Sequence, residues 1–345
     1  MSEPRTLRCG VVGVGRMGRH HARVYTQIPG CRLVGVVDRD AQRRDAAVSQ
    51  HACEGFATVE ALLGAGVDAV SIAVPTVHHL AAAEPLLGAG VACLIEKPLA
   101  NTLEDATALK ALAERHGAAL MVGHIERYNP VVRALQRQTA EEAGGAILPR
   151  FIEVHRVSPM TFRSVDVGVT LDMMIHDIDV VLMLMGGAEP DEVQASAVPV
   201  VTEHEDVCNA RLTFRTPRGR CVANITASRL AMKTERKIRI IAEDAYVSID
   251  YAAKAGVLIR RTANAEQLAG VREGLRAGND LSSMNYASLV RIEPLEVDDA
   301  EPLRLELEDF VRAVREGRRP PIDAAEGFAN VRTAKRIVEA ARQDW

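Results

Sequence analysis

The sequence predicts an α/β protein in two parts. We expect a doubly wound parallel sheet of the Rossmann type in residues 1–123 and an α+β part with a large, mostly antiparallel sheet in residues 124–345. A glycine-rich turn lies between the first apolar run and a helical stretch, and strands then alternate with helices as far as residue 123. After residue 150, apolar and polar residues alternate in many short segments, as they do in half-buried antiparallel strands.

Length and composition are those of an ordinary globular protein. At about 150 residues per domain, a chain of 345 residues is expected to form two domains. A net charge of −4 gives no general attraction to nucleic acid or to an anionic membrane surface. The first residues contain no apolar leader, and no apolar run approaches the ~18 residues of a spanning helix, so we expect a cytoplasmic protein that does not contact membranes.

The most specific local signal is the pattern G-x-G-x-x-G at Gly13, Gly15 and Gly18, between a strand-like run at 7–12 and a helix-like stretch at 16–28. In this pattern the first glycine permits a tight turn, the second lets the backbone approach a pyrophosphate, and the third lets the helix pack closely on the strand. The free N–H groups at the helix start face the phosphates. The pattern therefore predicts dinucleotide binding.

An acid follows the second predicted strand, residues 31–37. Asp38 lies about 20 residues after the last glycine, where a carboxylate accepts the ribose hydroxyls of NAD. We expect Arg16 and Met17 in the turn, and Arg39 beside the acid, to contact the cofactor as well. The carboxylate favours NAD because it repels a 2′-phosphate, while Arg39 leaves NADP as an alternative.

The rest of the first part continues the alternation of strands and helices. Strands are predicted at 67–74, 91–95 and 118–122, and helices at 40–52, 58–63, 77–87 and 102–116. Ligands bind beyond the carboxyl ends of such strands. We therefore expect one rim of the sheet to carry Asp38, Pro75, Thr76, Glu96, Lys97 and His124.

The second part reads as seven strands with helices before, between and after them. The strands are predicted at 151–157, 193–201, 207–214, 221–227, 238–241, 246–251 and 257–260, and the helices at 129–142, 171–185, 302–316 and 323–342. Residues 262–284 show no clear period, and we interpret them as an insertion or a flexible loop. An open antiparallel sheet has to be covered, so we expect a homodimer or homotetramer joined through its exposed face.

Two places carry candidate chemistry. Lys97 follows an apolar strand directly and precedes a proline, the residue at which cis peptide bonds occur, so its ammonium is held at the sheet rim. Asp172 and His176 are four residues apart and share one helix face, with Asp179 on the same side. Histidine can accept an alcohol proton near neutral pH, and a neighbouring carboxylate can orient it. The alternatives are a surface lysine and a structural Asp–His hydrogen bond.

Other chemistries lack support in the sequence. The pairs His20–His21 and His78–His79 have no third ligand at a suitable spacing, so no metal is predicted. A nucleophile motif such as G-x-S-x-G is absent, which gives no support for hydrolysis. The six cysteines contain no C-x-x-C pair and read as small, reduced hydrophobic residues.

Five motifs together resemble the glucose-fructose oxidoreductase and inositol dehydrogenase family (Gfo/Idh/MocA) over essentially the whole chain. They are the glycine turn, the acid after the second strand, VPTVHH, EKP, and GVTLDMMIHDID. The resemblance implies that Lys97, Asp172 and His176 face the nicotinamide of NAD as catalytic residues. It also implies that Pro75, Thr76 and His79 lie near the cofactor, with Glu96 near the nicotinamide ribose.

A narrower likeness lies in VGHIERYNPVV and in the residues from 151 to 179, which resemble the UDP-N-acetylglucosamine 3-dehydrogenases of this family. These enzymes oxidise the C3 hydroxyl of the sugar with NAD, giving a 3-keto nucleotide sugar that is later aminated for lipid A. The likeness implies contacts to cofactor or sugar diphosphate from Arg127, Tyr128, Asn129, Arg156 and Arg163. Any single arginine is also readily explained as a solvated side chain.

The sequence therefore supports an NAD-dependent oxidoreductase in which His176 accepts a hydroxyl proton, Asp172 orients His176, and Lys97 hydrogen-bonds the reacting oxygen. Two alternatives stay open. In the first, the enzyme acts on inositol or a free sugar. In the second, the chain is a sensor or scaffold that binds NAD without turnover. Residues 151–165 and 262–284 are expected to decide between substrates.

Overall fold

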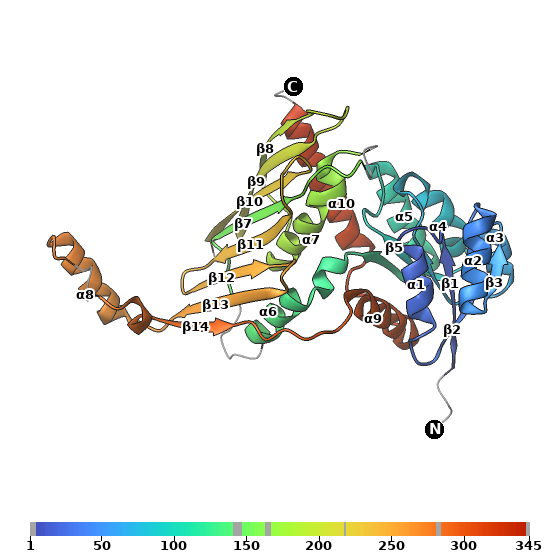
Figure 1. The fold of residues 1–345 in the computed structure, drawn as a ribbon, viewed down its shortest axis with the longest axis horizontal. Coiled ribbons are helices and arrows are strands. Elements are labelled where there is room, and N and C mark those ends of the chain that lie inside the picture. The colour runs from blue at the N-terminus through green and yellow to red at the C-terminus, as the bar shows by residue number, and fades with distance from the viewer. Residues whose placement is uncertain (1–4, 141–146, 163–166, 217–218, 281–283, 343–345) are drawn as a thin grey trace.

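The computed structural model describes residues 5–140, 147–162, 167–216, 219–280 and 284–342. Two sheets lie next to each other, with helices between them and on the outer side of the first sheet (Figure 1). No helix in these ranges combines the length and the hydrophobicity that crossing a bilayer requires.

The first sheet is parallel, as predicted, with the strand order β3-β2-β1-β4-β5-β6. Its strands are β1 (Leu7–Val12), β2 (Cys31–Val37), β3 (Glu54–Phe56), β4 (Ala69–Ile72), β5 (Ala92–Glu96) and β6 (Leu120–Gly123). Between them run α1 (Gly18–Tyr25), α2 (Ala41–His51), α3 (Val59–Gly64), the 3-10 turn η1 (Thr76–His78), α4 (His79–Gly88) and α5 (Leu103–His116). The strand order reverses between β1 and β4, which is where such sheets bind ligands.

Local sequence explains most of these elements. Side chains of Asp40, Thr58 and Thr102 accept hydrogen bonds from free N–H groups at the starts of α2, α3 and α5. The central strands β4 and β5 are almost wholly buried, in keeping with their unbroken apolar sequences. Strand β3 was not predicted from the sequence, because a strand of three residues shows no measurable period.

The second sheet has eight strands in the order β14-β13-β12-β11-β7-β10-β9-β8. They are β7 (Phe151–Val157), β8 (Glu192–Val198), β9 (Val207–Thr216), β10 (Gly219–Ser228), β11 (Glu235–Ile241), β12 (Ala245–Asp250), β13 (Ala255–Arg261) and β14 (Val290–Pro294). Its pairs are antiparallel except that β7 lies parallel to β10. Strand β7 alternates as expected, with Ile152, Val154 and Arg156 buried on the inner face.

Helices on the inner face connect the two sheets. They are α6 (Pro130–Ala140), α7 (Ile175–Leu184) and α10 (Ala324–Ala341), while α9 (Pro302–Glu316) packs on α1 and on the 3-10 turn η2 (Ile125–Tyr128). Helix α10 contacts α5, α7 and β8, and the N–H of Val122 donates to Ile322 O at 2.9 Å. The last two helices therefore tie the second sheet to the first.

Two expectations for the second part are corrected by the structure. The helix predicted at 171–185 begins as a π-turn, η3 (Thr170–Met174), before it continues as α7. Residues 265–276, expected to be irregular, form α8 (Ala265–Arg276), which starts with a capping box between Asn264 and Gln267. Helix α8 buries none of its residues and extends away from the body beyond β13 and β14 (Figure 1).

Candidate active site

The glycine turn after β1 has the shape that a dinucleotide needs. Gly13 has φ +85°, and a Cβ at Gly18 would lie 1.7 Å from Gly13 O, so neither position tolerates a side chain. At Gly15, by contrast, the only described neighbour of an added Cβ is a side-chain nitrogen of Arg43 at 3.9 Å. The turn is thus tight at its two ends and open in the middle, where the phosphates of a dinucleotide approach.

Asp38 lies at the carboxyl end of β2 and faces this turn. Its Oδ2 accepts the N–H of Val14 at 2.9 Å, and its Oδ1 accepts the N–H of Asp40 at the same distance. These bonds fix the carboxylate while each oxygen keeps a lone pair for a ribose hydroxyl. Arg16 and Arg39 are exposed on either side, and Met17 is half-buried. The residues present therefore fit a bound NAD.

The three residues expected near the cofactor after β4 differ in exposure. Pro75 is exposed and Thr76 half-buried, so both are accessible. His79 is not, and the structure corrects its expected role. It is 1% exposed, its Nε2 lies 3.1 Å from Val74 O, and its Nδ1 lies 3.1 Å from Pro98 O. Burial lowers the pKa of His79, so the neutral ring donates its single N–H to one of these carbonyls, and both nitrogens point into the protein and not toward a cofactor.

Glu96, the last residue of β5, pairs with a histidine that the sequence analysis considered only as a metal ligand. Its Oε1 lies 2.8 Å from Nε2 of His21, a fully buried residue of α1. Burial opposes ionisation of Glu96, but the hydrogen bond and charge of His21 outweigh it and lower the pKa of the carboxyl. The pair fixes α1 to the strand end that carries Lys97.

Lys97 crosses from the first sheet to the inner layer of the second part. It precedes a cis peptide bond to Pro98. Its Nζ donates to Asp172 O at 2.7 Å and lies 3.7 Å from Asp172 Oδ1. Burial lowers the pKa of Lys97, and the Asp172 carboxylate opposes that shift. The structure thus brings together two of the three predicted catalytic residues, which are 75 positions apart in sequence.

His176 lies one turn further along, at the start of α7, and is half-buried. Its Nδ1 is buried and has no hydrogen-bond partner in the described part of the chain. Burial, followed by the positive charge of Lys97, lowers the pKa of His176 well below the ordinary value of 6.5. At neutral pH the ring is therefore uncharged and able to accept a proton.

The expected hydrogen bond from Asp172 to His176 is not formed between these described residues, which corrects that expectation. Asp172 lies in the π-turn, where the wider backbone changes the relation between positions four apart, and its carboxylate faces Lys97. Asp172 therefore pairs with the lysine and forms no hydrogen bond with the histidine among the described residues.

Two arginines expected to contact substrate are instead used inside the protein. Arg156 forms a bidentate ion pair with Asp177, in which Nε donates to Oδ2 at 2.6 Å and Nη2 donates to Oδ1 at 2.9 Å. Its Nη1 also donates to Glu126 at 3.2 Å. Arg127 binds Asp179 in the same two-pronged way, at 2.8 and 2.7 Å, and reaches Glu326 at 3.0 Å. These ion pairs hold the helix that carries His176.

The neighbours of Arg127 have structural contacts as well. The Tyr128 side chain is buried. The Oδ1 of Asn129 accepts the N–H of Val131 at 3.2 Å, at the start of α6, and its amide donates to Glu126. The Tyr128 hydroxyl has no hydrogen-bond partner in the described part of the chain, but it is buried inside the protein. The polar atoms of Asn129 are bonded within the chain, so neither residue is placed as expected of a substrate contact. Arg163, the fifth predicted contact, lies outside the described residues.

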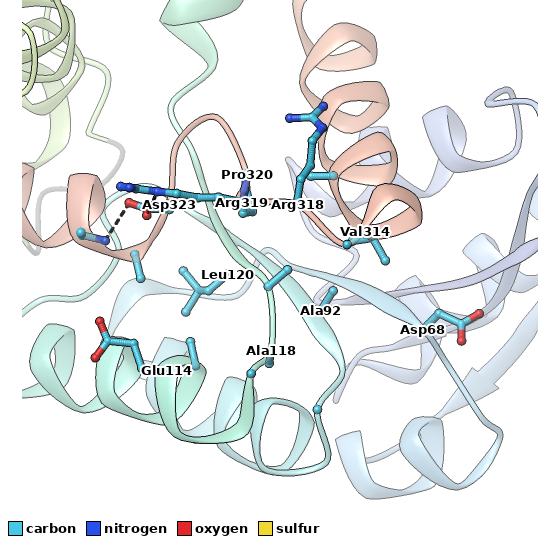
Figure 2. A pocket seen from close by; sticks show the side chains of 18 residues that line it. Asp68, Ala92, Glu114, Ala118, Leu120, Val314, Arg318, Arg319, Pro320 and Asp323 are labelled. Atoms are coloured by element: carbon cyan, nitrogen blue, oxygen red, sulfur yellow. Dashed lines mark hydrogen bonds and ion pairs between the residues drawn. The ribbon is translucent and has the colours of Figure 1, made fainter.

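One surface hollow lies far from these residues (Figure 2). Its walls include Leu120 at the start of β6, Glu114 of α5, and Arg318 and Arg319 between α9 and α10. It opens at the amino ends of the parallel strands, whereas Lys97 and Asp38 are at the carboxyl ends. It is therefore not the dinucleotide site.

Comparison with known families agrees with this geometry. Residues 7–124 match the model of an oxidoreductase family with an NAD-binding Rossmann fold, and residues 151–248 match the GFO/IDH/MocA C-terminal domain. The chain belongs to the Gfo/Idh/MocA family. Its first part is the NAD-binding domain of that family, and the chain is an oxidoreductase.

Curated relatives of the chain include named dehydrogenases. The UDP-N-acetylglucosamine 3-dehydrogenase of Acidithiobacillus ferrooxidans is 36% identical over 98% of this chain and 96% of its own length. Inositol 2-dehydrogenase 1 of Saccharopolyspora erythraea is 29% identical over 97% and 94%. Full-length relatives thus include enzymes named for a nucleotide sugar and for a cyclitol.

Two solved structures share the fold over nearly the whole chain. A crystal structure of the Acidithiobacillus ferrooxidans UDP-N-acetylglucosamine 3-dehydrogenase superposes with a TM-score of 0.84, at 35% identity and 98% coverage of both chains. Levoglucosan dehydrogenase in complex with NADH and levoglucosan gives 0.80 at 18% identity, covering 98% of each chain, which is a likeness of fold alone.

Proposed function

We propose that this protein is an NAD-dependent dehydrogenase that oxidises the C3 hydroxyl of UDP-N-acetylglucosamine to the 3-keto sugar. The observation that carries the proposal is the hydrogen bond from Lys97 to Asp172 in η3, one turn before the neutral His176, at the carboxyl edge of the dinucleotide-binding sheet. The full-length likeness to a UDP-N-acetylglucosamine 3-dehydrogenase supports the choice of substrate.

Each residue has a defined task in this proposal. His176 accepts the proton of the sugar hydroxyl, for which its uncharged ring is suited. The Lys97 ammonium donates a hydrogen bond to the same oxygen and stabilises negative charge as the proton leaves. The Asp172 carboxylate, 3.7 Å from Nζ, limits where that ammonium can move. NAD, when bound, supplies the acceptor for the hydride.

The glycine turn and Asp38 bind the cofactor in this proposal, with Arg16, Met17, Arg39, Pro75 and Thr76 around it. Glu96 positions the strand end through His21. The substrate then enters between Lys97 and the inner face of the second sheet. We propose that copies of the chain join through the outer face of that sheet, which carries polar pairs such as Arg239–Glu153.

The alternatives differ in what they predict for turnover. Purified protein with NAD should form NADH with UDP-N-acetylglucosamine and not with myo-inositol or glucose. Turnover with myo-inositol alone would mean that the substrate is a cyclitol, as the names of the inositol 2-dehydrogenase relatives indicate for those proteins. Tight NAD binding without turnover of any of the three would favour a sensor or scaffold.

The pH dependence of turnover follows from the lowered pKa values of His176 and Lys97. Because the pKa of His176 is lowered by burial and by Lys97, kcat/KM should stay constant as the pH falls through 6.5. Burial also lowers the pKa of Lys97 from 10.5, so activity should be lost on the alkaline side below that value. Steady-state rates measured across pH report both the acid and the alkaline side of the profile.

In Lys97→Arg the loss of activity at alkaline pH should vanish, because the guanidinium stays charged. An acid limb at the ordinary histidine pKa would contradict the assignment of His176.

A further inference from the structure

Arg236 lies on the inner face of the second sheet, at the end nearest the catalytic residues. Strand β11 pairs antiparallel with β7, and Arg236 stands directly opposite Arg156. Residues opposite each other in antiparallel strands point to the same face. Ile238 and Ile240, which alternate with Arg236, are buried on that face. The Arg236 side chain therefore extends toward the layer that contains α7.

The charge of Arg236 is attracted to the carboxylate of Asp177, but Arg156 already binds that carboxylate. Its partner across the ladder, Arg156, is held by the carboxylates of Asp177 and Glu126. Arg236 is exposed, and within the described part of the chain its side chain has neither an ion pair nor a hydrogen bond. Like charges in directly opposite positions destabilise a sheet. The sheet therefore gains nothing from an arginine at this position.

The positive charge of Arg236 affects two titratable residues of the catalytic helix α7, His176 and Asp177. Together with burial and the charge of Lys97, the charge of Arg236 lowers the pKa of His176. It also favours a lower pKa for the carboxyl of Asp177. A free guanidinium thus stands near the proposed proton acceptor, with its five N–H donors available.

We propose that Arg236 binds a phosphate of the substrate's diphosphate group and so selects a nucleotide sugar over a neutral sugar or cyclitol. This inference rests on the proposed function and specifies how the substrate is recognised. The guanidinium fork matches two phosphate oxygens at once. The pyrophosphate of the cofactor has its own place at Gly13–Gly18 on the other sheet, so Arg236 is available for the second ligand.

The test compares Arg236→Gln with Arg239→Gln in the full-length protein. Arg239 lies on the same strand but on the outer face, where it binds Glu153 at 2.7 Å, so its replacement controls for loss of an arginine from β11. UDP binding is measured by calorimetry with NADH saturating, which keeps UDP out of the dinucleotide site. We expect Arg236→Gln to weaken UDP binding about 10- to 100-fold, Arg236→Lys to weaken it less, and Arg239→Gln to leave it unchanged.

Steady-state kinetics provide the second readout. In Arg236→Gln the KM for UDP-N-acetylglucosamine should rise by a similar factor, about 10- to 100-fold, with kcat within a few fold of the wild type. Binding of N-acetylglucosamine 1-phosphate should also weaken, whereas binding of glucuronate should not change. A drop in glucuronate binding alone would assign the residue to a sugar carboxylate and overturn the phosphate contact.

The outcomes separate this inference from the proposed function. UDP binding that is equal in the wild type and Arg236→Gln, or absent from both, would overturn the role of Arg236 whatever the turnover. If the wild type binds UDP through Arg236 but oxidises only myo-inositol, the anion contact stands and the proposed reaction fails. A melting temperature of Arg236→Gln close to that of the wild type shows that the variant is folded.

Discussion

Replacing Lys97 with alanine should lower kcat about 10²- to 10³-fold while leaving the Kd for NAD nearly unchanged, as expected for loss of one donor to a developing oxyanion. The ammonium is held by Asp172 at 2.7 Å, whereas the proposed NAD contacts are mainly at the glycine turn and Asp38. Stopped-flow or steady-state rates with UDP-N-acetylglucosamine, together with a titration of NAD, measure the two quantities separately.

Two further lysine variants make the result specific. Lys110→Ala removes a lysine of α5 that lies 3.8 Å from Glu114, and it should leave kcat unchanged. Lys97→Arg keeps the positive charge but not the compact ammonium, and it should recover only part of the rate. If Lys97→Ala turned over at the wild-type rate, Lys97 would have no part in the chemistry.

Replacing Arg156 with alanine should lower the free energy of unfolding by about 3–5 kcal/mol, the usual cost of removing one partner from a buried ion pair. Arg156 is 3% exposed and satisfies both oxygens of Asp177. Burial raises the pKa of Asp177, and the charge of Arg156 opposes that shift. Without the guanidinium, a carboxylate stays buried beside His176 with no cation bound to it.

Urea denaturation of Arg156→Ala, compared with Arg239→Ala, measures this effect. The Arg239–Glu153 pair is on the more exposed outer face and should contribute only about 0–1 kcal/mol. Arg156→Ala combined with Asp177→Asn should recover part of the loss, because the second change removes the buried charge. Equal stability of Arg156→Ala and Arg239→Ala would contradict the role given to the buried pair.

Much of the fold could be predicted from sequence because its signals are local. The glycine turn, the capping residues Thr58 and Thr102 and the apolar strands act within a few positions. Residues 265–276 show why a weak local signal is missed. Asn264 and Gln267 form a capping box, and Leu268, Val271 and Leu275 have helical spacing, but one short stripe on a polar segment is easily taken for a loop.

The site was harder to predict, because its partners come from distant parts of the chain. Arg127 and Arg156 resembled phosphate ligands next to a motif, but the acids that neutralise them, Asp179 and Asp177, lie on α7, 52 and 21 positions away. Likewise, a helical spacing of four suggested that Asp172 orients His176. The π-turn at Thr170–Met174, which no local pattern announces, places Asp172 against Lys97 instead.

The central claim is that a hydride leaves C3 of a nucleotide sugar for NAD at the site formed by Lys97 and His176. It is tested most directly with UDP-N-acetylglucosamine that carries deuterium at C3. We expect the deuterium to appear in the NADH that is formed, with a slower rate than for the unlabelled sugar when hydride transfer limits turnover. NADH that contains no deuterium, with the label retained in the sugar, would contradict the proposed reaction.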